Sequence, residues 1–279
     1  MKDYDLIDSG EGRRLERFGK YILDRPDPEV LWQKTLPEIE WQKADAVFKD
    51  KWVNKNNVPE RWQLSYNEIK FWAKLSPFKH TGVFPEQDWQ WDYINNQISK
   101  SANRQINVLN LFAYTGIATL FAAKAGAKVT HLDSSKPAVT WANENRIRNG
   151  MQDAPIRWII DDAVIFTGRE SKRGVKYDAI IMDPPVYGHG PRGEIWDFSK
   201  GFPKLLENCR QILSAKPLFI LVNAYAVSSS PITLANTLQG YFGGLGGKIE
   251  HGELTLREKS AGRLLSTGIW ARWNANVLK

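Results

Sequence analysis

Acidic and amide side chains stand at the ends of four successive apolar segments beyond residue 105. They are Asn110 in INVLNLF, Asp133 in KVTHLD, Asp161 and Asp162 after IRWII, and Asp183 after YDAIIM. A single aspartate in such a place is usually a helix cap or a turn former. Four successive segments that end in this way predict instead a polar rim along one edge of a sheet, where a bound ligand donates hydrogen bonds to carboxylates.

The turn after the first of these segments indicates the kind of ligand. The sequence AYTGIAT holds one glycine, Gly116, whereas a dinucleotide pyrophosphate requires Gly-x-Gly-x-x-Gly so that backbone amides can approach it. NAD and FAD are therefore disfavoured. Asp133 follows at about the 20-residue interval at which such folds place an acceptor for two ribose hydroxyls. Asp162, directly before Ala163, is placed to accept a hydrogen bond from an adenine amino group.

The elements that must position these residues alternate regularly from residue 106 onward. Strands are expected at 106–112, 128–133, 156–161, 177–183 and 216–225, and helices at 118–126, 135–150 and 202–213, with a polar helix candidate between the third and fourth strands. Such alternation predicts right-handed βαβ units. The fold class is therefore α/β, with a Rossmann-like, mostly parallel sheet that helices cover on both faces.

Local signals support these helices and close the sheet. Ser134 or Ser135 can cap the second helix, and Gly126 stands where the first helix should stop. Segments 248–258 and 262–273 alternate apolar and polar residues, which predicts an antiparallel pair at the sheet edge.

The first ninety residues have a different character. Seven of the twelve tryptophans occur within residues 1–91, among proline-punctuated segments that favour short strands and turns. Residues 15–23 predict a strand pair around Gly19, and for residues 61–75 a strand and a short helix both remain open. We expect these tryptophans to form the core of a small domain, in preference to a surface on which nucleic-acid bases stack. We therefore expect a β-rich or α+β accessory domain at 1–78 and a catalytic domain at 79–279.

Composition excludes several classes of protein. One cysteine and four scattered histidines provide no metal-ligand spacing, so no metal is expected. No apolar stretch approaches the roughly 18 residues of a membrane helix, and the charged N-terminus is unlike a signal peptide, which together predict a cytoplasmic protein without a membrane partner.

The net charge is distributed unevenly along the chain. Residues 1–95 carry 15 Lys and Arg against 17 Asp and Glu, a net charge of −2. The whole chain carries +7, so the residues after 95 carry a net charge of +9. A basic catalytic part is typical of enzymes that act on polyanions.

The linked segments resemble a known family. VLNLFAYTGIATLFAAKAGAKVTHLDSSKPAVTWANENRIRNG, the pair DD and then YDAIIMDPPVYG are similar to the class I S-adenosylmethionine-dependent methyltransferases, within them to the bacterial 23S ribosomal RNA methyltransferases that modify cytosine C5 or guanine. The resemblance covers roughly residue 79 to the C-terminus. It implies S-adenosylmethionine as the cofactor and RNA, above all ribosomal RNA, as the partner.

The resemblance also implies roles for individual residues. A segment that closes over the cofactor corresponds to Phe84, Pro85, Glu86 and Gln87. The loop that holds the methionine end corresponds to Asn110, Phe112, Ala113, Tyr114, Thr115 and Gly116. Further cofactor contacts correspond to Asp133, Ser134, Asp161, Asp162 and Asp183. The catalytic group beside the transferred methyl corresponds to Asp183, Pro184, Pro185 and Tyr187.

One departure from the family decides the expected chemistry. Methylation of cytosine C5 needs a cysteine that attacks the base, and neither DPPVYG nor LVNAYAVSSS contains one. The single thiol, Cys209, lies at helical spacing with leucines and is expected to be a core residue. A base nitrogen needs no such adduct. Asp183 would accept its hydrogen bond with help from the proline carbonyls, Tyr187 would stack on the base, and Arg192 in a lid-like loop would meet a phosphate.

Two alternatives remain open from the sequence alone. A methyltransferase of the same fold would modify a protein or a small molecule, which the basic charge of the catalytic part disfavours. A catalytically silent RNA-binding assembly factor would retain the fold, which the complete set of strand-end residues disfavours. The sequence does not define the target nucleotide, the methylated atom or the oligomeric state.

Overall fold

The computed structural model describes residues 1–101 and 103–275. The chain divides into two compact units, the first formed by Met1–Trp89 with Thr255–Thr267 and the second by Gln90–Leu254 with Gly268–Lys279. This division differs from the predicted boundary after residue 78, because it adds residues 79–89 and a late segment to the first unit. Residues 276–279 of the expected catalytic domain lie outside the described part of the chain.

The first unit consists mainly of short strands. Its five-stranded sheet has the order β1-β2-β3-β4-β5, formed by Tyr4–Gly10, Arg13–Phe18, Tyr21–Pro26, Ala46–Phe48 and Trp52–Asn54. A separate hairpin pairs β6 (Arg61–Tyr66) with β7 (Ile69–Lys74), and the short helices are α1 (Glu38–Trp41) and η1 (Pro85–Gln87). The strand pair predicted around Gly19 is confirmed by β2 and β3, and the region from Arg61 is a hairpin rather than a helix.

Trp41 and Trp62 are buried in this unit, as expected of core tryptophans. The indole of Trp62 donates to the Phe18 carbonyl at 3.0 Å, so the polar edge of the buried ring is satisfied.

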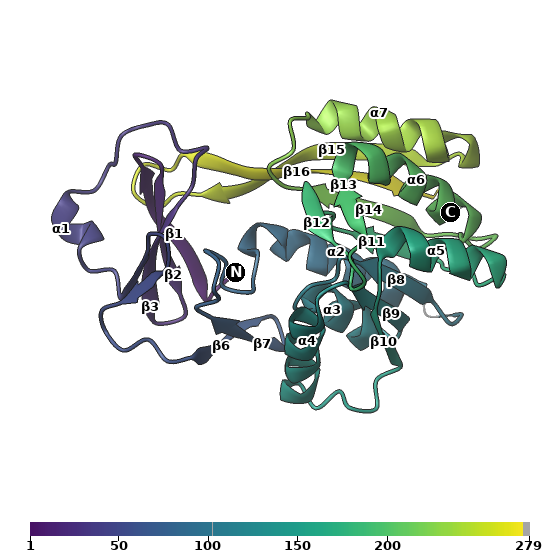
Figure 1. Cartoon of the computed structure of the whole chain (residues 1–279), viewed down its shortest axis with the longest axis horizontal. Helices are drawn as coiled ribbons and strands as arrows, with labels where there is room; N and C mark the ends of the chain where they lie inside the picture. Colours follow the sequence, from purple (N-terminus) through teal and green to yellow (C-terminus); the bar gives the residue numbers. More distant parts are fainter. Residues whose placement is uncertain (102, 276–279) are drawn as a thin grey trace. The chain divides into compact units, whose positions relative to one another are not determined.

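The second unit is an α/β fold around a seven-stranded sheet (Figure 1). The sheet has the order β10-β9-β8-β11-β14-β16-β15. Its strands are β8 (Asn107–Leu111), β9 (Lys128–Asp133), β10 (Ile156–Ile160), β11 (Ala179–Met182), β14 (Phe219–Ala224), β15 (Lys248–Arg257) and β16 (Leu264–Asn274). The first five are parallel and β16 runs antiparallel to β14. The predicted Rossmann-like sheet with an antiparallel C-terminal strand is therefore confirmed.

Helices connect these strands and cover both faces of the sheet. They are α2 (Asp88–Lys100), α3 (Ile117–Lys124), α4 (Lys136–Arg148), α5 (Ala163–Lys172), α6 (Phe198–Gln211), α7 (Pro231–Phe242) and the short η2 (Gly243–Leu245). Ser135 caps α4, with its hydroxyl 3.4 Å from the Ala138 amide, and Gly126 has the positive φ of a C-terminal cap after α3. The sequence analysis did not predict α7, although Ser230 and Pro231 are a helix-start signal.

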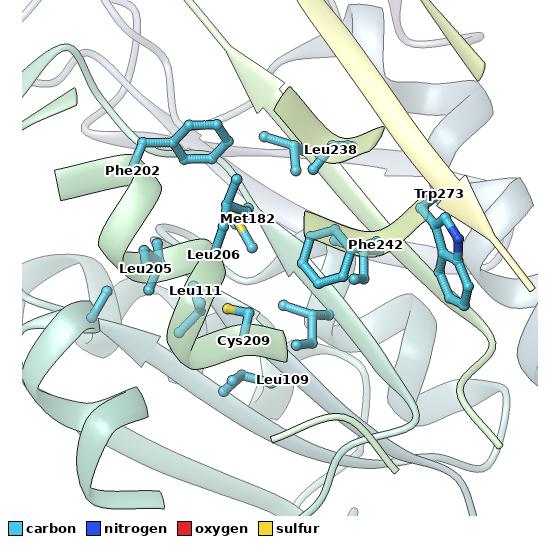
Figure 2. Close-up of a cluster of buried hydrophobic side chains, with 14 of the residues drawn as sticks. Leu109, Leu111, Met182, Phe202, Leu205, Leu206, Cys209, Leu238, Phe242 and Trp273 are labelled. Atoms are coloured by element: carbon cyan, nitrogen blue, oxygen red, sulfur yellow. The ribbon is translucent and has the colours of Figure 1, made fainter. Parts of the chain in front are cut away.

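The main core of this unit lies between the sheet and helices α5, α6 and α7. Leu109, Leu111 and Met182 face it from the sheet, and Leu205 and Leu206 face it from α6 (Figure 2). A second cluster on the other face packs α2 and α3 against the sheet through residues such as Ile94 and Ala122. Two apolar layers hold the strands rigidly, so the polar groups at their carboxyl ends have fixed positions.

Candidate active site

The loop after β8 has an unusual backbone. Phe112 and Tyr114 have φ values of 54° and 47°, and Gly116 has 76°, so three of five consecutive residues are left-handed. Non-glycine residues in this region carry strain that a packed surrounding must maintain, and such strain gathers at binding sites. A side chain at Gly116 would meet Ala142 Cβ at 2.8 Å, so glycine is required here both by φ and by close packing against α4.

Asp133, the last residue of β9, holds the loop after β8 in place. Its carboxylate accepts hydrogen bonds from the amides of Tyr114 at 2.9 Å and Ser135 at 2.8 Å, and the Ser134 amide also contributes. Burial raises the pKa of Asp133, which these backbone donors oppose. A carboxylate has about four acceptor positions, so three backbone donors leave room for a further donor. Asp133 therefore positions the loop and keeps capacity for a ribose hydroxyl, and its contact with the ribose stays a prediction.

Tyr114 lies beside Asp133, and its ring contacts Trp141 at a centroid distance of 6.0 Å. Burial and the neighbouring Asp133 charge raise the pKa of Tyr114 to about 12, so its hydroxyl stays protonated and can donate. The Thr115 carbonyl accepts from the Asn145 side chain at 2.9 Å, which ties the same loop to α4. Ala113 is anchored through its amide to the Leu132 carbonyl at 3.0 Å.

The buried side chain of Asn110 takes part in a hydrogen-bond network within the protein. Its amide donates to the Thr119 hydroxyl at 3.0 Å, and this hydroxyl lies 2.9 Å from His131 Nδ1. Burial lowers the pKa of His131 to about 3, so the ring is neutral at physiological pH. Asn110 was expected at the site from the sequence, whereas Thr119 and His131 were not. Their spacing on a helix and a neighbouring strand gives no short-range signal, because only the sheet register places His131 opposite Asn110.

The two aspartates after β10 have separate structural partners. Asp162 is the N-cap of α5 and accepts from the Ile165 amide at 2.8 Å. Asp161 is buried and forms ion pairs with Arg169 and with Arg192, the latter at 3.1 Å. The structure thus accounts for both side chains, and their predicted cofactor contacts remain a prediction.

Asp183, Pro184 and Pro185 follow β11 directly. The Asp183 amide lies 3.4 Å from the Leu111 carbonyl, which places the motif beside the end of β8. The Trp196 indole donates to the Pro185 carbonyl at 2.6 Å. That carbonyl therefore already accepts one hydrogen bond, and its expected contact with the substrate stays a prediction.

The segment after this motif forms a hairpin where the sequence suggested an open loop. Strands β12 (Tyr187–His189) and β13 (Ile195–Asp197) pair antiparallel. Tyr187 is 55% exposed, and its ring forms a T-shaped contact with His189 at a centroid distance of 5.3 Å, so much of the ring is accessible to solvent. Arg192 at the tip binds Glu194 at 2.9 Å as well as Asp161, and its expected contact with a phosphate stays a prediction.

The predicted cofactor-closing segment belongs to the first unit. Pro85, Glu86 and Gln87 form η1, with Phe84 as its N-cap. Burial raises the pKa of Glu86, which the Arg14 charge opposes. Its predicted closing over the cofactor stays a prediction.

Cys209 is a core residue, as predicted. It is fully buried on α6, among Leu205, Leu206 and Met182 (Figure 2). Burial raises the pKa of its thiol well above its usual range, which disfavours the thiolate that nucleophilic attack would require.

The strand order, the strained loop after the first strand and the aspartates at successive strand ends define a class I methyltransferase fold. Residues 42–229 match the family described as S-adenosylmethionine-dependent methyltransferase. The chain belongs to this family and is an enzyme that uses S-adenosylmethionine.

Several relatives are known by sequence and by structure. A crystal structure of the S-adenosylmethionine-dependent methyltransferase from Agrobacterium tumefaciens has a TM-score of 0.94 and 42% identity, covering 98% of this chain and 90% of that one. Ribosomal RNA large subunit methyltransferase K/L from Pseudoalteromonas atlantica is 32% identical over 73% of this chain and 28% of its own length. The protein of the same name from Shewanella frigidimarina is 33% identical over 55% of this chain and 21% of its own length. The chain thus matches less than a third of these two relatives.

The residues of the second unit fit the cofactor. Asp133 retains acceptor capacity, and the Phe112–Gly116 loop offers a compact, glycine-poor turn that suits a ligand without a pyrophosphate. Within the described residues, no group of three potential metal-ligating side chains comes together. Among the helices of that same part of the chain, none combines the length and the apolar character needed to cross a membrane.

Proposed function

We propose that this enzyme methylates a nitrogen atom of a base in RNA, and that ribosomal RNA is its substrate. The observation that carries the proposal is the contrast between two sites. The only cysteine is buried in the core, whereas Asp183, Pro184 and Pro185 stand at the carboxyl end of β11 next to the exposed ring of Tyr187.

The chemistry follows from this contrast. Carbon methylation requires a thiolate adduct, and a buried neutral thiol cannot provide one. Bound S-adenosylmethionine supplies an electrophilic methyl group, whose bond to sulfur breaks as its bond to the acceptor nitrogen forms. Asp183 would accept an N–H hydrogen bond from that base and direct the nitrogen lone pair. The face of Tyr187 would hold the base by stacking, and the nitrogen's excess proton would leave to Asp183 or water.

RNA as the substrate is supported by charge and by relatives. The part of the chain after residue 95 carries a net charge of +9, which favours a polyanion. The sequence relatives described above are named ribosomal RNA methyltransferases. An enzyme acting on ribosomal RNA would work in the cytoplasm, in agreement with the predicted location. No feature of the described residues favours a protein or small-molecule substrate, or a silent assembly factor.

The test uses the full chain with tritiated cofactor and total RNA from a strain that lacks the gene. We expect label in ribosomal RNA and an N-methylated nucleoside by mass spectrometry. Cys209→Ser should retain the wild-type rate per folded molecule. A product of 5-methylcytosine that Cys209→Ser abolishes would overturn the nitrogen mechanism. Label in protein but not in RNA would favour the other substrate class, and cofactor binding without any transfer would favour the silent factor.

The salt dependence of RNA binding provides an independent test. Each phosphate neutralised on single-stranded RNA contributes a slope of about −0.7 in log affinity against log salt. A titration with no salt dependence would point to an uncharged substrate.

A further inference from the structure

A cavity of about 470 Å³ lies in the second unit beside the Asp-Pro-Pro motif. Val186, directly after the motif, forms part of its wall. The remaining walls come from the start of α6, the loop after β14 and the first turns of α7. Asp183 and Tyr187 do not line it, so the cavity is separate from the groups expected to hold the methylated base.

One wall of the cavity is apolar and aromatic. The rings of Phe198 and Phe202 are stacked, with centroids 4.7 Å apart and planes inclined by 14°. The Phe198 amide donates to the Val186 carbonyl at 2.9 Å, which fixes this wall to the segment after the motif. Flat apolar surfaces of this kind suit the face of a planar ring.

Another part of the lining consists of residues with hydroxyl groups. Ser228 and Ser229 come from the loop after β14, and Thr233 and Thr237 lie one turn apart on α7. In the same loop Ala226 has a φ of 54°, a left-handed conformation that a non-glycine residue adopts at a cost. Backbone strain of this kind clusters at ligand sites.

Asp197 is the one charged residue among the described residues that line this cavity. Its Oδ1 atom caps α6, accepting from the Lys200 amide at 3.2 Å and from the Ser199 hydroxyl at 2.6 Å. These hydrogen bonds, the Ser199 hydroxyl first, lower the pKa of Asp197, so the group is an anion at neutral pH. A carboxylate repels phosphate and favours N–H donors. The cavity itself therefore suits a base, whereas the exposed Lys200 and Lys204 on the same helix suit the RNA backbone.

We propose that this cavity binds the base next to the methylated base in the RNA, and that Asp197 selects a flanking base that presents N–H donors. The inference rests on the proposed function. Val186 is three residues after Asp183, a reach of at most about 11 Å along an extended chain. A cavity so near the motif, yet separate from Asp183 and Tyr187, is placed for a neighbouring nucleotide. Contacts to flanking nucleotides are a general source of sequence context in base-modifying enzymes.

Short RNAs carrying the mapped methylation site provide the test, with each of the four bases placed in turn on either side of the target. Wild type should discriminate by about tenfold or more at one flanking position, which corresponds to one lost charge-assisted hydrogen bond of about 1.4 kcal/mol. Asp197→Asn keeps the helix cap, because asparagine caps as well as aspartate, but replaces an acceptor with a donor. It should reduce the discrimination to about threefold or less, or change the preferred base, without altering affinity for S-adenosylhomocysteine.

A second pair of variants tests the cavity without touching Asp197. Thr237→Trp places a large ring in the cavity, whereas Asn236→Trp places the same ring on the next, exposed position of α7. We expect kcat/KM on the preferred RNA to fall about tenfold or more for Thr237→Trp alone, with S-adenosylhomocysteine binding retained by both.

Unchanged discrimination in Asp197→Asn, or equal rates for the two tryptophan variants, would overturn the flanking-base site and leave RNA methylation intact. A wild-type enzyme that methylates no RNA would instead overturn the proposed function, and the flanking-base site with it.

Discussion

The two units both bury charged groups, but they satisfy them in different ways. In the first unit, the buried charges around Glu16 are paired with other side chains. Glu16, fully buried, accepts from the Tyr4 hydroxyl at 2.6 Å and from two nitrogens of Arg25, the second at 2.9 Å. Arg14 lies 3.1 Å from Asp27 and 3.9 Å from Glu16. Because Glu16, Tyr4 and Arg25 hydrogen-bond to one another, these groups act in folding and offer little capacity to a ligand.

In the second unit, carboxylates at the strand ends are held mainly by backbone amides. Asp133 accepts from the amides of Tyr114, in the loop after β8, and of Ser135, and Asp162 accepts from the Ile165 amide in the first turn of α5. A carboxylate held by backbone amides retains acceptor positions for a ligand. Its orientation is also fixed, because backbone donors do not move when neighbouring side chains change rotamer. Asp161, paired with two arginines, is the exception. The comparison teaches that the kind of partner, rather than burial alone, separates structural carboxylates from those available for binding.

The largest expected effect is on the stability of the first unit. Burial alone would raise the pKa of Glu16, but the charges of Arg25 and Arg14 hold this pKa at about 2. Glu16→Gln would leave buried guanidinium groups uncompensated, which costs about 3–5 kcal/mol of unfolding free energy. Urea denaturation should show this loss. The exposed pair Lys43–Glu40 provides the control, since Glu40→Gln should cost under about 1 kcal/mol. Equal losses in the two variants would contradict the contrast between the units.

Asp183→Ala tests the reacting edge. Loss of the acceptor that orients the nitrogen should lower turnover by about a hundredfold or more, while affinity for S-adenosylhomocysteine stays nearly unchanged. Single-turnover methylation and calorimetry measure the two quantities. Asp153→Ala, at an exposed aspartate, is the control. A variant that loses cofactor affinity and turnover in parallel would show that Asp183 binds the cofactor rather than orienting the base.

Asp133→Ala addresses the cofactor end of the edge. The substitution removes a charged acceptor from the ribose and a partner from the Tyr114 amide. We expect S-adenosylhomocysteine affinity to fall about tenfold to a hundredfold, or about 1.5–3 kcal/mol. Wild-type affinity in calorimetry would remove Asp133 from the site, and tighter binding of NAD would contradict the cofactor assignment.

The smallest expected effect is a pH dependence from His131. Burial lowers the pKa of the folded-state ring to about 3, against about 6.5 when unfolded. The unfolded chain therefore binds more protons between these values, and stability that is fully present above pH 6.5 is lost as pH falls towards 3. The loss at pH 5 is about 2 kcal/mol. His131→Asn should flatten the decline in unfolding free energy between pH 7 and 5, whereas exposed His251→Gln should not.

Much of the second unit could be predicted from sequence because its signals are local. Strand and helix periods, the cap before α4 and the aspartates after each strand all lie within a few residues of what they specify. Long-range pairing could not be predicted. The engagement of Pro185 by Trp196, and the reciprocal amide hydrogen bonds of Gln90 and Asn223 at 2.8 Å, depend on how the chain folds back on itself. The contact between Arg192 and Asp161 could not be predicted for the same reason, because the two residues are 31 positions apart in sequence.

Gly116 restricts which amino-acid substitutions the binding loop and α4 can tolerate. The 2.8 Å approach of its absent Cβ to Ala142 makes positions 116 and 142 a size-coupled pair. Any side chain at 116 would need both a smaller residue at 142 and a different backbone turn, and only glycine is smaller than alanine. Almost any single substitution at position 116 would therefore destabilise this turn. We expect sequences that preserve the loop to vary freely along the exposed side of α4 while keeping position 142 small.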